Sequence, residues 1–291
     1  MTEQARPILV TGATGNTGRA IVDALADRGA PVRAMVRTEA DRGRVRAGVE
    51  VVVADFDEAA AIEAALDGAE RAYLVTPSSE RAEEQQKRFA DLAAKAGTRH
   101  LVVLSQLGSE EHSPVRFLRY HAAVERHIRD LGIGYTFLRP NLYFQGLLMF
   151  AGSISAEGTF FAPIGDATVS AVDVRDIASV AAAALTEPGH LGQTYTITGP
   201  EAISHHDVAR AISGATGRDV RFVDVPPEAF AAALRGVGVP PWQADGLVED
   251  YAHYARGEAA EVSPTVRHLT GEGPRDIAGF ARDHARAFGS E

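Results

Sequence analysis

Residues 8–19 read Ile-Leu-Val-Thr-Gly-Ala-Thr-Gly-Asn-Thr-Gly-Arg, and this stretch determines the expected fold. Apolar residues 8–10 are typical of a buried strand, and apolar residues at helical spacing follow from residue 20. Gly12 permits a sharp turn off the strand, Gly15 lets backbone N–H groups approach a pyrophosphate, and Gly18 lets the next helix pack closely. The free N–H groups and positive end of that helix would hold the anion. In this strand–turn–helix context, the run predicts a dinucleotide site rather than an ordinary glycine turn.

Composition narrows the classes of function. The chain has 291 residues, enough for one large or two modest domains, and a formal net charge of −10. That charge argues against nucleic acid as a partner, because phosphates require a basic face. Cysteine is absent, which excludes disulfides, a thiolate nucleophile and cysteine zinc sites. No apolar run approaches the ~20 residues that span a bilayer, so we expect no membrane partner. We also expect a cytoplasmic protein that is a monomer or a homodimer.

The first half of the chain alternates short β-branched runs with helical patterns. Strands are expected at 8–10, 32–36, 49–53, 72–75, 101–104 and 135–138, with helices between them, the clearest at 81–96 and 115–130. Such alternation predicts an α/β fold in which helices cover both faces of a parallel sheet.

The second half has a looser pattern. Strands are expected at 169–172, 193–197 and 220–223, and helices at 173–185, 204–213, 227–234, 241–254 and 274–288. We interpret residues 1–140 as a nucleotide-binding domain, on which 173–185 packs back, and residues 141–291 as a smaller lobe that forms the substrate cleft.

Ligands of parallel sheets bind at the carboxyl ends of the strands, so residues that follow strands are candidates for the site. The glycine run, Arg37, Asp55, Thr76 and Ser105 all stand there. An acid after the second strand would accept from the ribose 2′-OH of NAD, whereas Arg37 suits the 2′-phosphate of NADP. The alternative for Arg37 is a solvated surface side chain. Asp55 lies near the adenine in this interpretation, or caps a helix.

Several segments together resemble the NmrA-like branch of the atypical short-chain dehydrogenases/reductases. They are Thr11 to Arg19, Ala54-Asp55-Phe56-Asp57, Leu74-Val75-Thr76-Pro77, His121-Ala122-Ala123-Val124-Glu125, Tyr135 to Asn141, and Val172 to Ala178. The resemblance implies a Rossmann-type doubly wound parallel sheet with a smaller C-terminal α/β lobe, and it implies NADP(H) as cofactor. The branch includes NADPH-dependent quinone reductases, triphenylmethane dye reductases and regulators that bind the nucleotide without known turnover. The expected cofactor-binding residues are Gly12, Thr14, Gly15, Asn16, Thr17, Gly18, Arg37, Asp55, Phe56, Thr76, Pro77 and Pro140.

The usual proton-transfer pair of short-chain dehydrogenases is absent. That pair is a Tyr with a Lys four residues later, but Tyr120 is followed at that spacing by Val124, and the lysines are Lys87 and Lys95 only. The chemistry that remains favours hydride transfer to a quinone-like or other conjugated aromatic, since water can supply the protons. The alternative is a non-catalytic NADP(H)-sensing regulator.

The candidate catalytic residues are His121, Glu125 and Ser105. Spacing by four places His121 and Glu125 on one helix face, where the carboxylate would orient the imidazole, or where both simply anchor the helix to the sheet. Ser105 keeps the position of the usual catalytic serine after the fifth strand.

Substrate-cleft walls are expected after the sixth strand, at Asn141, Tyr143 and Phe144, which suit a flat apolar substrate or else form the core of the small lobe. We expect no metal site, and interpret His205-His206-Asp207 as a helix start that Ser204 caps. Asp173 and Asp176 are interpreted as a helix cap and as partners of Arg175 or Arg139.

Overall fold

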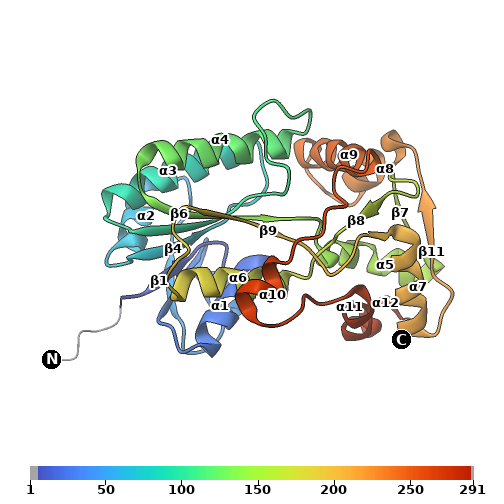
Figure 1. The fold of residues 1–291 in the computed structure, drawn as a ribbon, viewed down its shortest axis with the longest axis horizontal. Helices are drawn as coiled ribbons and strands as arrows, with labels where there is room; N and C mark the ends of the chain where they lie inside the picture. The colour runs from blue at the N-terminus through green and yellow to red at the C-terminus, as the bar shows by residue number, and fades with distance from the viewer. Residues whose placement is uncertain (1–5, 290–291) are drawn as a thin grey trace. The chain divides into compact units, whose positions relative to one another are not determined.

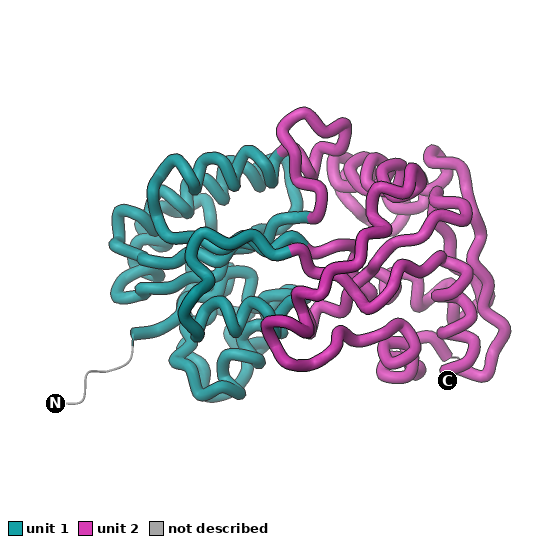
Figure 2. The backbone as a smooth tube through the Cα atoms, viewed as in Figure 1, with its two compact units in different colours: residues 1–106, 120–139, 177–195 teal, residues 107–119, 140–176, 196–291 magenta. Residues whose placement is uncertain are grey.

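The chain folds into two compact units (Figure 2). A computed structural model describes residues 6–289. Unit 1 holds the chain up to Gln106 together with Tyr120–Arg139 and Ile177–Tyr195, and unit 2 holds Leu107–Arg119, Pro140–Asp176 and the chain from Thr196 onward. The chain passes from unit 1 to unit 2 after Gln106, Arg139 and Tyr195, and it returns to unit 1 at Tyr120 and Ile177.

Unit 1 is built on a seven-stranded sheet in the order β3-β2-β1-β4-β5-β6-β9. The pairs from β3 to β6 are parallel. The strands are β1 (Ile8–Val10), β2 (Val32–Val36), β3 (Glu50–Val53), β4 (Arg71–Leu74), β5 (His100–Leu104), β6 (Gly134–Pro140) and β9 (Gln193–Ile197), the last residues of β6 and β9 belonging to unit 2. The order reverses between β1 and β4, which creates the switch point where ligands of such sheets bind.

Helices cover both faces of this sheet, so the expected α/β fold is confirmed (Figure 1). α2 (Ala59–Leu66), α3 (Ala82–Lys95) and α4 (Arg116–Leu131) cover one face, while α1 (Asn16–Asp27) and α6 (Val174–Thr186) cover the other. A short 3-10 helix, η1 (Glu39–Arg44), follows β2. Phe89, Val124 and Phe137 are fully or almost fully buried between α3, α4 and the sheet, which fixes these helices by apolar packing.

Unit 2 contains two small sheets and the remaining helices. β11 (Arg221–Asp224) pairs parallel to β7 (Thr159–Ala162), and β10 (Ile203–Ser204) pairs antiparallel to β8 (Thr168–Val169). The helices are η2 (Phe144–Phe150), α5 (Ala151–Glu157), α7 (His205–Thr216), α8 (Pro227–Gly236), α9 (Pro241–Ala255), α10 (Thr265–Thr270), α11 (Ile277–Asp283) and α12 (Ala285–Phe288). Their core contains Phe160, Phe230, Phe280 and Phe288, all fully buried or nearly so.

Several elements of unit 2 differ from the sequence expectation. The strand expected at 169–172 is reduced to Thr168–Val169, and Val172 instead makes an isolated bridge with Tyr143. The helix expected at 274–288 is divided into α11 and α12 at His284. The sequence does not predict η2, α5, β7, β10 or α10, because each spans seven residues or fewer, which are too few for a clear periodic pattern.

Candidate functional site

The glycine run forms a tight turn between β1 and α1. Gly12 has a φ of +59°, and a Cβ atom there would lie 2.6 Å from Val75 Cγ1. A Cβ atom on Gly18 would lie 2.1 Å from the Gly12 carbonyl oxygen. Only glycine fits either position, because one needs left-handed backbone and the other needs close approach of helix to turn. Thr11 fixes the turn, since its hydroxyl donates to the Val75 carbonyl and accepts from the Val75 N–H, both at 2.8 Å.

The N-terminus of α1 is suited to bind an anion. Gly15 is its N-cap, no side chain caps the helix, and its first turn holds no acidic residue. Gly15 and Asn16 are exposed, and a Cβ at Gly15 would meet only the Gly12 carbonyl oxygen at 3.3 Å. Thr14 is half-buried in the turn and Thr17 is buried in the first turn of the helix. The open backbone N–H groups therefore fit the pyrophosphate of a dinucleotide.

Two unpaired guanidinium groups belong to unit 1. Arg37 directly follows β2, Arg19 lies on α1, and both are exposed. Among residues 6–289, no hydrogen bond or ion pair engages either side chain, whereas neighbouring Arg42 and Arg44 pair with Glu39 and Asp41. Because β1 and β2 are adjacent parallel strands, Arg37 and the glycine turn stand at the same edge of the sheet. An unpaired cation at this edge is available for a phosphate.

The next strands bring their own candidates to this edge. The Asp55 carboxylate accepts from the Asp57 N–H at 2.9 Å, which closes a turn after β3. Phe56 packs edge-on against Phe89 with 6.0 Å between ring centroids. Thr76, after β4, accepts from the Gln86 amide at 2.9 Å, and Pro77 is exposed beside it. The structure thus gathers the expected residues of unit 1 along one edge.

Glu125 is the centre of a buried ionic cluster. It is 1% exposed, and its carboxylate accepts from the Ser105 hydroxyl at 2.6 Å, from two Arg139 nitrogens at 2.8 and 2.6 Å, and from Arg129 at 2.9 Å. This cluster ties α4 to the ends of β5 and β6. Ser105 and Glu125, expected in catalytic roles, are therefore both engaged in holding the helix to the sheet.

His121 is not paired with Glu125. No hydrogen bond joins them in the described chain, since the carboxylate is occupied by arginines and serine. The imidazole is 9% exposed, lies 4.1 Å from the Tyr120 ring centroid, and leaves Nδ1 without a hydrogen-bond partner. Burial, and then the charge of Arg139, lowers the pKa of His121 to about 3. His121 is thus a neutral imidazole at ordinary pH.

Asn141 forms part of the framework of unit 2. It follows Pro140, the last residue of β6, and is 4% exposed. Its amide nitrogen donates to the Ser170 hydroxyl and the Ala259 carbonyl, both at 2.8 Å, and its carbonyl accepts from the Leu142 N–H. These bonds use its polar atoms within unit 2.

Tyr143 and Phe144 line an apolar pocket inside unit 2. The pocket has an empty volume of about 630 Å³ including its opening to solvent. Its walls come from η2 and from the segments around β8, β10, α7, α8 and α9, and most of its lining side chains are aliphatic or aromatic. A lining of this kind suits a small aromatic molecule.

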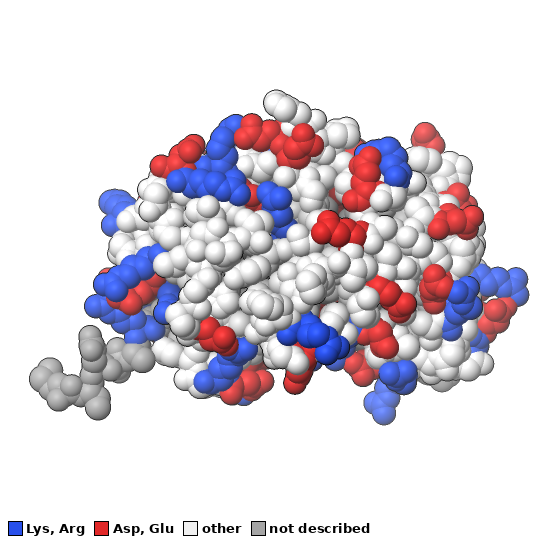
Figure 3. Space-filling view, viewed as in Figure 1, with Lys and Arg blue, Asp and Glu red and all other residues white. Residues whose placement is uncertain are grey.

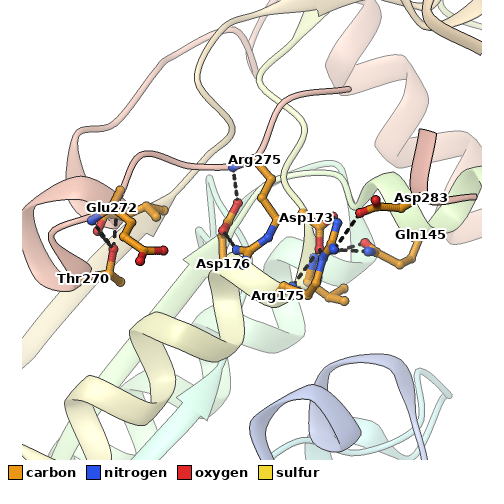
Figure 4. A network of polar contacts seen from close by, with 10 residues as sticks. Gln145, Asp173, Arg175, Asp176, Thr270, Glu272, Arg275 and Asp283 are labelled. Atoms are coloured by element: carbon orange, nitrogen blue, oxygen red, sulfur yellow. Dashed lines mark hydrogen bonds and ion pairs between the residues drawn. The ribbon is translucent and has the colours of Figure 1, made fainter. Parts of the chain in front are cut away.

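An ionic network holds the start of α6 within unit 2 (Figure 4). Asp173 is fully buried and accepts from Arg175, which also pairs with Asp283, and from Gln145. Although burial would raise the pKa of Asp173, its bonds to Arg175 keep that pKa below the usual value. Asp176 pairs with Arg275 rather than with Arg139. Of the two arginine partners proposed for these acids, Arg139 is therefore wrong, because Glu125 engages it.

The described residues also show where metal-ligating, apolar and charged side chains lie. Residues 6–289 contain no cluster of three metal-ligating side chains, and no helix there is long and apolar enough to cross a membrane. His205 and His206 begin α7, where Ser204 and Asp207 form a capping box, as expected for a helix start. On the face in Figure 3, Lys and Arg lie among Asp and Glu instead of forming a basic patch.

Sequence reasoning missed three groups of residues. Arg44 donates to the Thr14 carbonyl at 3.3 Å, which links η1 to the glycine turn. Gln86 supports Thr76. His205 and Tyr251 share the pocket with Tyr143. None of these residues has a local motif, since each acts through a partner that is distant along the chain.

Comparison with known proteins agrees with this geometry. A profile described as the NmrA-like family matches residues 4–270. The chain belongs to the NmrA-like family. This NmrA-like chain is 38% identical to an NAD(P)H azoreductase of Xenophilus azovorans over 97% of its length and 99% of that protein. It is 40% identical to a (4-alkanoyl-5-oxo-2,5-dihydrofuran-3-yl)methyl phosphate reductase of Streptomyces griseus over 98% of its length and 100% of that protein.

A solved structure is also similar to this NmrA-like chain. The NADPH-dependent quinone oxidoreductase QOR2 of Escherichia coli, complexed with NADPH, superposes with a TM-score of 0.85 and 28% identity. The match covers 95% of this chain and 99% of that one. The likeness therefore extends over both units.

Proposed function

We propose that this NmrA-like protein is an NADPH-dependent oxidoreductase that reduces a quinone-like or other conjugated aromatic substrate. The observation that carries the proposal is the uncapped N-terminus of α1 at the same sheet edge as the unpaired Arg37. The names of its relatives support it, because they are reductases of azo compounds, of a dihydrofuranone phosphate and of quinones, and one holds NADPH.

The residues of unit 1 would bind the cofactor in defined ways. The glycine turn and the open N–H groups of Asn16, Thr17 and Gly18 would receive the pyrophosphate, and Arg37 would pair with the 2′-phosphate. Asp55, Phe56, Thr76 and Pro77 would line the adenosine and ribose side. When bound, NADPH supplies the hydride.

Proton supply is the second part of the proposal. The residue four after Tyr120 is the buried Val124, so the lysine of the usual proton-transfer pair is absent at that spacing. His121 is neutral and would act as an N–H hydrogen-bond donor, with Glu125 and Ser105 as positioning residues that fix α4. A conjugated acceptor suits this arrangement. The negative charge that hydride transfer leaves on the acceptor is delocalised over its rings, and water can then supply the protons.

The test follows NADPH consumption by the purified protein with a panel of small quinones. We expect turnover by the wild type and none by Gly15→Val, whose branched side chain would occupy the pyrophosphate space. The control is Gly43→Val, because Gly43 is exposed on η1 and an added Cβ atom there meets no other atom within 4 Å. If the protein bound NADPH but reduced no quinone of the panel, the proposed reductase activity would be contradicted and a nucleotide-sensing regulator would be favoured.

A further inference from the structure

The side chains that line the apolar pocket of unit 2 are uncharged. Its lining includes no Asp, Glu, Lys or Arg side chain. Aromatic rings form much of the wall, with Phe144, Phe150 and Phe230 beside two tyrosines. A charged ligand inside would find no counter-ion, whereas a planar ring would find faces and edges for aromatic packing.

The polar groups that line the pocket are uncharged. His205 is 4% exposed, and its Nε2 lies 3.5 Å from the Tyr251 hydroxyl oxygen. Burial, and secondarily the neighbouring His206, lowers the pKa of His205 to about 4, so the ring is neutral at pH 7. Burial raises the pKa of the Tyr143 and Tyr251 hydroxyls, which keeps both protonated. These groups offer hydrogen bonds to a carbonyl or hydroxyl without offering charge.

A buried acid, Asp250, directly precedes Tyr251 on α9. Asp250 is 5% exposed and accepts from the Tyr254 hydroxyl at 3.1 Å. Its charge contributes to the raised pKa of Tyr143 and of Tyr251, which places its field at the pocket wall. The lining supplies no cation to offset that field. An anion in the pocket would thus find no counter-ion in the lining.

We propose that this pocket binds a planar, uncharged aromatic ring bearing a carbonyl or hydroxyl group and rejects the same ring when it carries an anionic substituent. The proposal rests on the proposed function, for which it names the substrate class. Selection arises from three features together: the aromatic wall, the neutral His205–Tyr251 pair, and a lining without Lys or Arg, with the buried Asp250 next to Tyr251 on α9.

Equilibrium dialysis of the purified full-length protein, without NADPH, against 1,4-naphthoquinone and 1,4-naphthoquinone-2-sulfonate tests the selection. The two probes share a ring system and differ in one negative charge. We expect the uncharged quinone to bind at least ~10-fold more tightly, the ratio that about 1.4 kcal/mol produces. Equal affinities, or tighter binding of the sulfonate, would overturn the proposal. Because no turnover is measured, an inactive protein that still binds selectively would contradict only the proposed function.

Two glycine variants locate the binding in this pocket. Gly146 lines it, is exposed, and has no atom within 4 Å of an added Cβ, so Gly146→Trp can fold and fill the pocket. Gly152 has equally open surroundings but lies outside the pocket lining, on α5. We expect Gly146→Trp to weaken quinone binding at least ~10-fold and Gly152→Trp to leave it unchanged. The same affinity in both variants would place the quinone elsewhere.

A charge-removing variant tests the role of Asp250. Asp250→Asn keeps an oxygen that accepts from Tyr254 but removes the negative charge. We expect the preference for the uncharged quinone to fall several-fold, mainly through better binding of the sulfonate. Glu201→Gln removes one charge from an exposed position outside the pocket lining and should leave the preference unchanged. An undiminished preference in folded Asp250→Asn would contradict the role of this acid.

Discussion

At the scale of single residues, Arg37 makes the sharpest prediction about the cofactor. Its guanidinium is exposed and unpaired within the described chain, and it stands beside the glycine turn. Loss of one charge-assisted contact should weaken NADPH binding by about 1.5–3 kcal/mol, roughly 10- to 100-fold. Arg37→Ala should leave NADH binding within about twofold, because NADH lacks the 2′-phosphate. Fluorescence titration with both nucleotides measures this difference.

The control for that titration is Arg99→Ala. Arg99 is exposed but precedes β5, at the amino end of a parallel strand and thus at the opposite edge of the sheet. It should leave the affinity for both nucleotides unchanged. If Arg37→Ala weakened NADPH and NADH equally, Arg37 would not face the 2′-phosphate.

Tyr120 and His121 test the mechanism at the same scale. Since no lysine supports Tyr120, we expect Tyr120→Phe to keep kcat within a few-fold, against the ~10²–10⁴-fold effect of a working general acid. His121→Ala should reduce kcat more, because it removes a neutral donor. His121 should also give no inflection near pH 6.5 in the rate profile, since its pKa is lowered to about 3. Steady-state quinone reduction by the wild type and both variants from pH 5.5 to 8 measures the two changes in kcat and the pH profile. A thousand-fold loss of kcat in Tyr120→Phe would restore a tyrosine-based mechanism.

At the scale of the element, the packing of α4 depends on one carboxylate. Glu125 is buried and bonds to Arg129, Arg139 and Ser105. Removal of one partner of a buried ion pair costs about 3–5 kcal/mol, because the remaining charge loses its counter-ion. We expect Glu125→Leu to lower the free energy of unfolding by about that amount. Urea denaturation at pH 7 measures it.

The matched comparison is Glu63→Leu on α2. Its ion pair with Lys95 is exposed, with side-chain exposures of 42% and 72%, so the loss should stay below about 1 kcal/mol. A loss in Glu125→Leu as small as in Glu63→Leu would mean that apolar packing alone holds α4.

At the scale of the whole molecule, buried neutral histidines make stability depend on pH. His100, His121 and His205 have pKa values lowered by burial to about 4, 3 and 4. The unfolded chain takes up protons at about pH 6.5, where the folded chain does not. Stability is therefore fully present above pH 6.5 and is lost as the pH falls toward 4, by about 1–2 kcal/mol per histidine between pH 7 and pH 5.

His100→Gln checks this expectation. His100 Nε2 lies 2.7 Å from the Thr136 hydroxyl, which donates to the His190 carbonyl, so a glutamine amide can replace the donor. Urea midpoints at pH 7, 6 and 5 should fall less steeply in the variant than in the wild type. Parallel curves would show that His100 is not the source of the loss.

The sequence by itself determined the elements whose signal is local. The glycine run identified β1, the turn and α1, because left-handed backbone at Gly12 and close approach at Gly18 admit only glycine. The strands of unit 1 matched within one or two residues, since buried parallel strands are continuous β-branched runs. Ser204 identified the start of α7 as its N-cap, and the structure adds the reciprocal bond from Asp207 that makes a capping box.

Only the tertiary structure decided which charged and polar groups meet. Helical spacing suggested that Glu125 orients His121, but the carboxylate pairs with Arg139, which β6 carries. Likewise Asp176 pairs with Arg275, 99 positions along the chain, and the pocket combines η2 with α7 and α9. Periodicity determines which face of an element is apolar, whereas the partner of a buried charge depends on which distant strand or loop packs beside it.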